Sequence, residues 1–123
     1  MEKSQCFGLW KEHCGEEFPS LREVPHDILS SSDAMKVADY LDGCPVWIAS
    51  PGMVMSCVNS DEVAGTLSLR TNGKWAWQDT MAHYVRRLRI SPPIQFLYDI
   101  KNGHAAIPLE SELEIHAMHF PDF

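Results

Sequence analysis

The side chains most able to do chemistry in this sequence are cysteines and histidines near both ends of the chain. Cys6, His13 and Cys14 stand near one end, and His116 and His119 stand near the other. Thiolate sulfur and imidazole nitrogen are preferred ligands of zinc. However, the short ligand spacing of structural zinc sites is missing, and the adjacent His13 and Cys14 would point differently in any regular element. We therefore expect no metal site here.

Nucleophilic catalysis is the other chemistry that these residue types offer. A thiol enzyme needs a cysteine beside a histidine, but any chain with four cysteines and six histidines contains such pairs. No G-x-S-x-G turn and no glycine-rich phosphate loop occurs. Ser50, before Pro51-Gly52, is interpreted as a turn residue. The acids at 110–114 and at 61–62 are interpreted as a solvated surface. We expect no catalytic residue and no cofactor.

A cluster of basic residues is the feature that most needs an explanation. Residues 66–90 contain five basic residues and one acid, whereas the rest of the chain holds 16 acids and five basic residues. The five are Arg70, Lys74, Arg86, Arg87 and Arg89. Arginine is suited to binding carboxylates and phosphates. The cluster either contacts a partner or pairs within the chain with the acidic run at 110–114.

The strongest local prediction is a β-hairpin at about residues 66–77. Asn72-Gly73, between TLSLRT and KWAW, is a preferred pair for a two-residue type I′ turn. That turn places Thr71 opposite Lys74 and Arg70 opposite Trp75. Trp75 and Trp77 then share a face with Arg70, and the leucines occupy the other face. Neither face can be fully solvated, so one must be covered by a helix or by a partner.

A helix from about Gln78 to Arg89 should follow the hairpin, capped by Gln78 or Asp79. Its apolar stripe is Met81, Tyr84, Val85 and Leu88. Arg86 and Arg87 project away from this stripe, and His83 lies one turn earlier. The candidate partner-binding residues are therefore Arg70, Trp75, Trp77, His83, Arg86 and Arg87.

The remaining elements are predicted from caps, breakers and periodicity. A helix capped by the serines at 30–32 should bury Met35, Ala38 and Leu41 and end at Gly43. PVWIAS (45–50) indicates a buried strand, and MVMSCV (53–58) fits a strand or a helical turn. Another helix should start after Ser91-Pro92 and end at 102–103. Residues 108–120 fit a strand or a helix, and we favour a helix. CFGLWKEH, near the start, fits a short strand or one helical turn.

These elements predict a single α+β domain spanning residues 1–123, with an antiparallel sheet packed against three or four helices. The chain has 123 residues, of which 45% are hydrophobic and 22% charged, as is ordinary for a globular protein.

The sequence shows no apolar run of membrane-spanning length and no signal peptide. The four cysteines include no C-x-x-C, and we expect Cys44 and Cys57 to be small buried hydrophobes. We therefore expect a cytoplasmic protein with no membrane contact. The net charge of −7 argues against a nucleic-acid partner.

The hairpin and the helix after it carry a resemblance. Leu69-Arg70-Thr71-Asn72-Gly73-Lys74-Trp75-Ala76-Trp77, followed by Asp79 and Ala82-His83-Tyr84-Val85, resembles a pattern of small uncharacterised bacterial proteins. In these, a D/N-G turn precedes W-x-W and a helix with a Y-V pair. Several look like immunity proteins, which neutralise a toxin made by the same cell. The resemblance spans residues 45–100, departs at Gln78, where the pattern has proline, and includes no catalytic residue.

Three function hypotheses follow. The favoured one is a non-enzymatic protein that binds another protein, as an immunity-type inhibitor of a toxin. An acidic inhibitor would gain association speed from electrostatic steering toward a basic toxin surface. The alternatives are a small metal-dependent or thiol enzyme, and a structural subunit of a homo-oligomer, such as a homodimer, that uses the tryptophan face.

Overall fold

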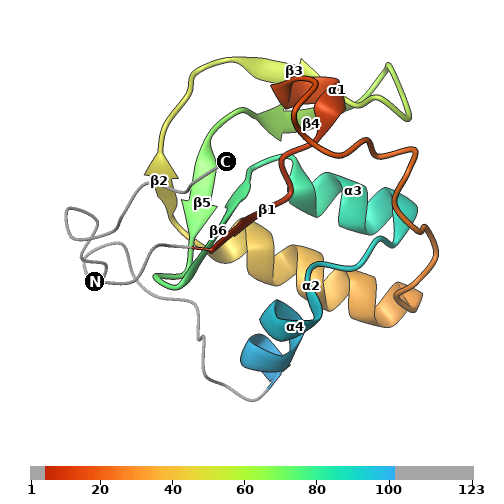
Figure 1. The fold of residues 1–123 in the computed structure, drawn as a ribbon, viewed down its shortest axis with the longest axis vertical. Coiled ribbons are helices and arrows are strands. Elements are labelled where there is room, and N and C mark those ends of the chain that lie inside the picture. Colours follow the sequence, from red (N-terminus) through yellow and green to blue (C-terminus); the bar gives the residue numbers. More distant parts are fainter. Residues whose placement is uncertain (1–4, 102–123) are drawn as a thin grey trace.

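The computed structural model describes residues 5–101, which form helices and two small sheets (Figure 1). The elements in chain order are β1 (Gln5–Phe7), α1 (Lys11–Cys14), α2 (Ser31–Gly43), β2 (Val46–Ile48), β3 (Met53–Met55), β4 (Val63–Thr66), β5 (Leu69–Thr71), β6 (Trp75–Gln78), α3 (Met81–Leu88) and α4 (Ile94–Lys101). The predicted α+β class is confirmed. None of the described helices has the length and apolar character needed to span a bilayer. The helix expected at 108–120 lies outside the described residues.

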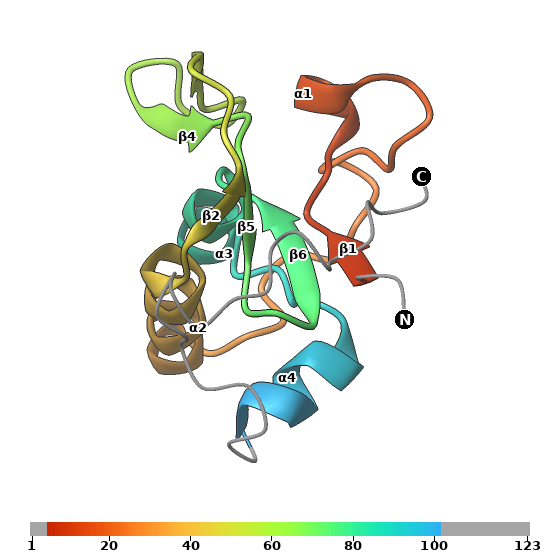
Figure 2. The ribbon, with the colours of Figure 1, turned by 90° about the vertical axis from the view of Figure 1, so that its left-hand side faces the viewer.

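The larger sheet has the strand order β1-β6-β5-β2. β5 pairs antiparallel with both β6 and β2, whereas β1 pairs parallel with β6 (Figures 1 and 2). The sheet is therefore mixed rather than wholly antiparallel, because the N-terminal segment supplies a strand from far away in sequence. The sequence CFGLWKEH was compatible with a short strand or with one helical turn. The structure has both, because β1 ends within this segment and α1 begins within it.

The hairpin forms between β5 and β6, but its register differs from the predicted one. Arg70 lies opposite Trp77 and Thr71 lies opposite Ala76. The backbone N–H of Asn72 donates to the carbonyl oxygen of Trp75 at 3.3 Å, so the two turn residues are Gly73 and Lys74. The observed pairing is shifted by two positions from the predicted one. Since side chains alternate between the two faces along a strand, a shift of two leaves both tryptophans on the same face as Arg70.

The side chain of Asn72 explains the shift. Its amide oxygen accepts the backbone N–H groups of Lys74 at 3.1 Å and Trp75 at 2.8 Å. Asparagine favours this position at the start of a turn, where its side chain replaces a backbone acceptor. Gly73, with a φ of 97°, then takes the first central position, as in a type II′ turn. Asn72 therefore needs no positive φ.

The tryptophan face of the hairpin is the centre of the core. Trp77 is completely buried and Trp75 is 4% exposed. Phe96 of α4 contacts both rings, with centroid distances of 5.5 Å and 5.7 Å. The indole N–H of Trp77 donates to the carbonyl oxygen of Leu41 in α2. This face is thus covered by the protein's own helices α2 and α4.

Helix α2 begins as its sequence predicts. The hydroxyl of Ser30 accepts the backbone N–H of Asp33 at 3.1 Å and caps the helix. Its buried side is formed by Ala34, Val37, Ala38 and Leu41. The prediction for Met35 is wrong, because its side chain is 52% exposed. The buried stripe follows the i, i+3, i+4, i+7 spacing from Ala34, which leaves Met35 off it.

Helix α3 starts later than predicted. Thr80, rather than Gln78 or Asp79, is the residue before the first turn, because Gln78 belongs to β6. Met81, Tyr84 and Val85 are buried as predicted, whereas Leu88 is only partly buried against the core.

The last turn of α3 is closed by a segment far away in sequence. Arg89 follows the helix with a φ of 50°, and its carbonyl oxygen accepts the N–H groups of Ile28 and Leu29. The N–H of Asp27 donates to the carbonyl oxygen of Leu88. Two carbonyl groups at the C-terminal end of α3, those of Leu88 and Arg89, are thereby satisfied by the segment at 27–29.

The predicted strand at 66–71 is broken into two. β4 ends at Thr66 and pairs with β3 in a separate two-stranded sheet, while β5 begins at Leu69. The break is held by Asp79, whose carboxylate accepts the N–H and the hydroxyl of Thr66 at 2.9 Å and 3.0 Å. We name residues 53–66, which comprise β3, β4 and their connecting loop, the β3–β4 arm.

Two other predicted elements differ in detail. PVWIAS forms β2, which is half-buried rather than buried because it lies at the edge of the larger sheet. Helix α4 begins at Ile94 and does not use Ser91 as a cap, since that hydroxyl donates to the carbonyl oxygen of Pro92. The open question at 53–58 is resolved as a strand over its first half.

Candidate functional site

All five basic residues of the cluster at 66–90 form ion pairs within the chain. Arg86 of α3 contacts Asp39 at 3.0 Å and Asp42 at 2.8 Å, both in α2. Arg87 pairs with Glu62 of the β3–β4 arm. The remaining pairs are Arg70–Asp79, Lys74–Asp99 and Arg89–Asp27. Among the described residues the cluster is thus explained by intramolecular pairing, with acids other than the run at 110–114, which lies outside them.

Arg70 has the most constrained position of the five. Its Nε donates to Asp79 at 2.6 Å, and its Nη1 donates to the carbonyl oxygen of Cys44 at 2.6 Å. Burial raises the pKa of Asp79, but the guanidinium of Arg70 and the hydrogen bonds from Thr66 outweigh it and hold this pKa below its usual value. Arg70 therefore joins β5 to the end of α2 and the start of β2, which is a structural task.

Two more of the six candidate partner-binding residues, Trp75 and Trp77, lie in the core. Their indole N–H groups are already bonded, to Asp99 at 2.9 Å and to the carbonyl oxygen of Leu41 at 3.3 Å. Neither ring is offered to a partner in this structure. The sequence predicted that a helix or a partner must cover one face of the hairpin. The tryptophan face is covered by helices α2 and α4 of the protein itself.

His83 is the candidate with the most suggestive neighbour, because its Nε2 lies 2.7 Å from the hydroxyl oxygen of Ser56. A serine beside a histidine is the start of a nucleophilic site. However, the Ser56 hydroxyl also accepts the N–H groups of Val58 and Asn59 and is buried. Both of its lone pairs are thus engaged, and its proton points to His83. In this structure the Ser56 hydroxyl holds the loop after β3 and joins it to His83 of α3.

A second histidine contacts the same loop. His13 of α1 lies 2.5 Å from the hydroxyl oxygen of Tyr84, which also accepts the backbone N–H of Cys57. Burial lowers the pKa of both His13 and His83, which favours the neutral form of both imidazoles. Helix α1, helix α3 and the base of the β3–β4 arm are therefore joined through neutral hydrogen bonds.

The thiols do not assemble a site in the described part of the chain. None of the four cysteines forms a disulfide. Burial raises the pKa of Cys6 to about 12 and that of Cys44 to about 11, which makes both poor nucleophiles at neutral pH. The expectation that Cys57 is buried is wrong, because it lies exposed in the loop of the arm. Within residues 5–101 no three histidine, cysteine or acidic side chains are grouped to hold a metal ion.

An apolar surface that the sequence did not reveal lies on the β3–β4 arm. Met53, Met55 and Val63 are 71%, 48% and 45% exposed, and Val58 in the loop is 45% exposed. Met53 and Met55 are two residues apart in β3, and Val63 lies opposite Met55, so these three share one face. Val54, on the other face, packs against the core. The arm thus turns one apolar face inward and one outward.

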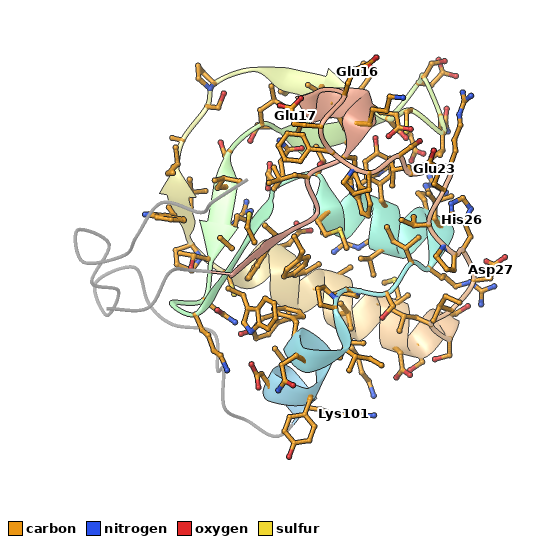
Figure 3. The ribbon with its side chains drawn as sticks, in the orientation of Figure 1. Glu16, Glu17, Glu23, His26, Asp27 and Lys101 are labelled. Carbon is orange, nitrogen blue, oxygen red and sulfur yellow. The ribbon has the colours of Figure 1, made fainter. Side chains whose placement is uncertain are left out.

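Acidic side chains lie at the same end of the molecule as this apolar surface. Helix α1 and the arm lie together at one end in both ribbon views (Figures 1 and 2). Glu16 and Glu17 follow α1 at that end (Figure 3) and are exposed, as is Asp61 in the loop of the arm. We name the apolar face of the arm and these three acids the arm end.

Sequence reasoning missed the arm end for a physical reason. MVM has the composition of a buried strand, and only the pairing of β3 with β4, away from the larger sheet, exposes its methionines. One signal of an unusual position was present in the sequence, because residues 53–58 fitted a helical turn as well as a strand.

Comparison of the chain with protein families, with curated proteins and with solved structures gives no match in any of the three.

Proposed function

We propose that this protein is a non-enzymatic protein that binds another protein through the arm end. The observation that carries the proposal is the outward apolar face formed by Met53, Met55 and Val63, with Val58 beside it. Methionine is flexible and polarisable, and it is common on surfaces that bind proteins. Contiguous exposed apolar surface of this kind marks interaction sites far more often than isolated exposed side chains do.

The contrast with the rest of the described surface supports this assignment. The other large exposed hydrophobic residues are Ile28, Met35, Ile94 and Tyr98, which lie on three different parts of the chain. Single exposed hydrophobic residues are normal in proteins and need no explanation. The arm holds four such residues, whereas helix α4 holds two, Ile94 and Tyr98, and Ile28 and Met35 stand singly.

The charge of the arm end favours a basic partner. Glu16, Glu17 and Asp61 are exposed, and the chain has a net charge of −7. An apolar centre with a charged rim is a common arrangement in protein interfaces, and the rim charge speeds association with an oppositely charged surface. We propose an immunity-type inhibitor that blocks a basic toxin in the cytoplasm, where reducing conditions keep cysteines such as these four unpaired.

The two alternatives receive less support. The homo-oligomer hypothesis depended on the tryptophan face, which α2 and α4 cover. The enzyme hypothesis has its best candidate in Ser56 and His83, and there the serine is buried and fully hydrogen bonded.

The first step of the test is to search the neighbouring genes for one that encodes a basic toxin. Its purified product is then titrated calorimetrically with the wild type and two variants, and the absence of any such gene would count against the immunity function. The double variant Met53→Glu/Met55→Glu should weaken binding at least about tenfold, because central interface residues dominate the affinity. Met35→Glu is the matched control, since Met35 is similarly exposed but lies on α2. Met35→Glu should bind the toxin as tightly as the wild type does. In cells that make the toxin, the wild type should restore growth and the double variant should not.

Circular dichroism melts of both variants are measured before the titrations, to check that each variant keeps the fold. If the double variant binds as tightly as Met35→Glu, the arm end is not the binding surface. If the wild-type protein does not bind the toxin at all, the immunity function is excluded. A dimer that dissociates in the double variant, measured by light scattering, would assign the arm to self-association instead.

A further inference from the structure

A cavity of about 500 Å³ lies between the N-terminal segment and the chain that connects α3 to α4. This volume falls within the range of small-molecule sites, which is about 300–1,000 Å³. Its walls are mostly apolar and include three aromatic rings. The main apolar wall residues are Phe7, Leu9, Trp10, Phe18, Val24 and Pro92. None of these apolar residues belongs to the arm end, but Glu17, which is part of the arm end, also lines the cavity.

The wall of the cavity is held in place by the chain itself. The backbone N–H of Lys11 donates to the carbonyl oxygen of Pro19 at 2.8 Å. The carboxylate of Glu12 accepts the hydroxyl of Ser20 at 2.6 Å and the N–H of Leu21 at 3.0 Å. These bonds fold residues 11–21 back on themselves, so the cavity is formed before any ligand binds.

One polar group in this wall has no partner. Trp10 is 7% exposed, and its indole N–H finds no acceptor among the described residues. Buried indole N–H groups normally donate a hydrogen bond, as those of Trp75 and Trp77 do here. This unbonded N–H distinguishes Trp10 from Trp75 and Trp77 and makes its resonance the reporter for the cavity wall.

Glu17 gives the cavity its charge. It lines the cavity, is exposed, and forms no ion pair with a described residue. A carboxylate beside aromatic rings is a favourable environment for an organic cation, which the carboxylate attracts by charge and the rings attract through their negative faces. The other charged residues of the N-terminal segment lie outside the cavity wall.

We infer that this cavity binds a small aromatic amine, with its apolar ring among Phe7, Trp10 and Phe18 and its ammonium group near Glu17. The cavity, its three aromatic rings and the unpaired carboxylate of Glu17 support this class of ligand together. The inference shares Glu17 with the arm end but not the apolar face of Met53, Met55 and Val63, so a titration of the cavity and the toxin titration of Met53→Glu/Met55→Glu test the two proposals separately.

The test is a titration with tryptamine, followed through the indole N–H resonances in two-dimensional NMR spectra. Tryptophol and indole-3-acetate are the neutral and anionic comparisons, because they share the ring system of tryptamine. Tryptamine should shift the Trp10 resonance saturably and leave those of Trp75 and Trp77 in place. Trp10→Phe assigns the resonance, and backbone assignment replaces this variant if it does not fold. Indole-3-acetate should bind most weakly.

Glu17→Gln should weaken tryptamine binding about two- to fivefold, as expected for an exposed charge pair, and should leave tryptophol binding unchanged. Glu16→Gln is the matched control, since Glu16 is its exposed neighbour but does not line the cavity. Without a saturable shift of Trp10 by any of the three compounds, the site does not exist. Equal binding of all three compounds, unchanged by Glu17→Gln, would exclude an amine as the ligand class.

Discussion

At the level of single residues, side chains that look like functional groups in the sequence are tied into the fold. Arg70 bonds to Asp79 and to the carbonyl oxygen of Cys44, and Arg86 connects α3 to α2. The sequence showed that these arginines lie off the apolar stripe of α3 or beside the tryptophans. It could not show which acids they meet, because those acids come from segments distant in sequence. A basic cluster in an acidic chain is therefore weak evidence of a partner.

Asp99 gives a test of this internal pairing. Its side chain is 6% exposed and pairs with Lys74 at 2.8 Å. Lys74 and the indole N–H of Trp75 lower the pKa of Asp99 from 3.8 to about 2. As the pH falls through this interval, the unfolded chain binds a proton before the folded chain does. The wild type should therefore lose stability there, because acid favours the state that binds more protons.

Asp99→Asn removes this titration. The variant should be less stable than the wild type at about pH 5, and the difference should shrink toward about pH 2.5, as measured by urea denaturation. Asp61→Asn, at an exposed loop position, is the control and should follow the wild type at both pH values. A difference for Asp99→Asn that stays constant over this range would contradict the assigned pairing.

At the level of elements, the sequence predicted which segments form helices and the hairpin better than it predicted their pairing. The capped start of α2, the hairpin and the apolar stripe of α3 follow from local spacing, and all three are present. The register of the hairpin depended on whether Asn72 occupies the turn or precedes it, and side-chain hydrogen bonds decide that. The break between β4 and β5 depends on Asp79, which no local pattern indicates.

The turn can be tested by substituting its glycine. Gly73 has a φ of 97°, which a β-branched residue adopts only with strain. Gly73→Val should therefore destabilise the fold by about 1–3 kcal/mol, measured by thermal or urea denaturation. Gly52→Val is the matched control, because a side chain at Gly52 meets nothing within 4 Å. Equal melting temperatures for the two variants would mean that the turn is assigned wrongly.

At the level of the whole molecule, the four tryptophans are divided between the core and a single sheet edge. Trp10, Trp75 and Trp77 are buried, whereas Trp47 of β2 is half-buried at the edge of the larger sheet. The α+β class could be predicted from the order of elements. Which tryptophans are buried could not, since that depends on how α2 and α4 cover the hairpin.

Fluorescence quenching by acrylamide should report this division. Quenching of the native protein should come mainly from Trp47, because the quencher must reach the ring. Trp47→Phe should remove most of it, while Trp77→Phe should leave it nearly unchanged if the fold is kept, which circular dichroism checks. Quenching that persists in Trp47→Phe and is lost in Trp47→Phe/Trp10→Phe would come from Trp10, which lines the cavity. Strong quenching that persists in this double variant would show that Trp75 or Trp77 is accessible, contrary to their burial.

The parallel strand β1 has a consequence for the order in which the chain folds. The hairpin β5–β6 closes a short loop, whereas β1 pairs residue 5 with residue 75 and closes a loop of about 70 residues. Loop-closure entropy makes such a distant pairing costly until its partner strand exists. The hairpin should therefore form early, with β1 added to a sheet that is already in place. In hydrogen exchange, the amides of β1 should open before those of β6, so the N-terminal segment should detach as a unit while the tryptophan core stays closed.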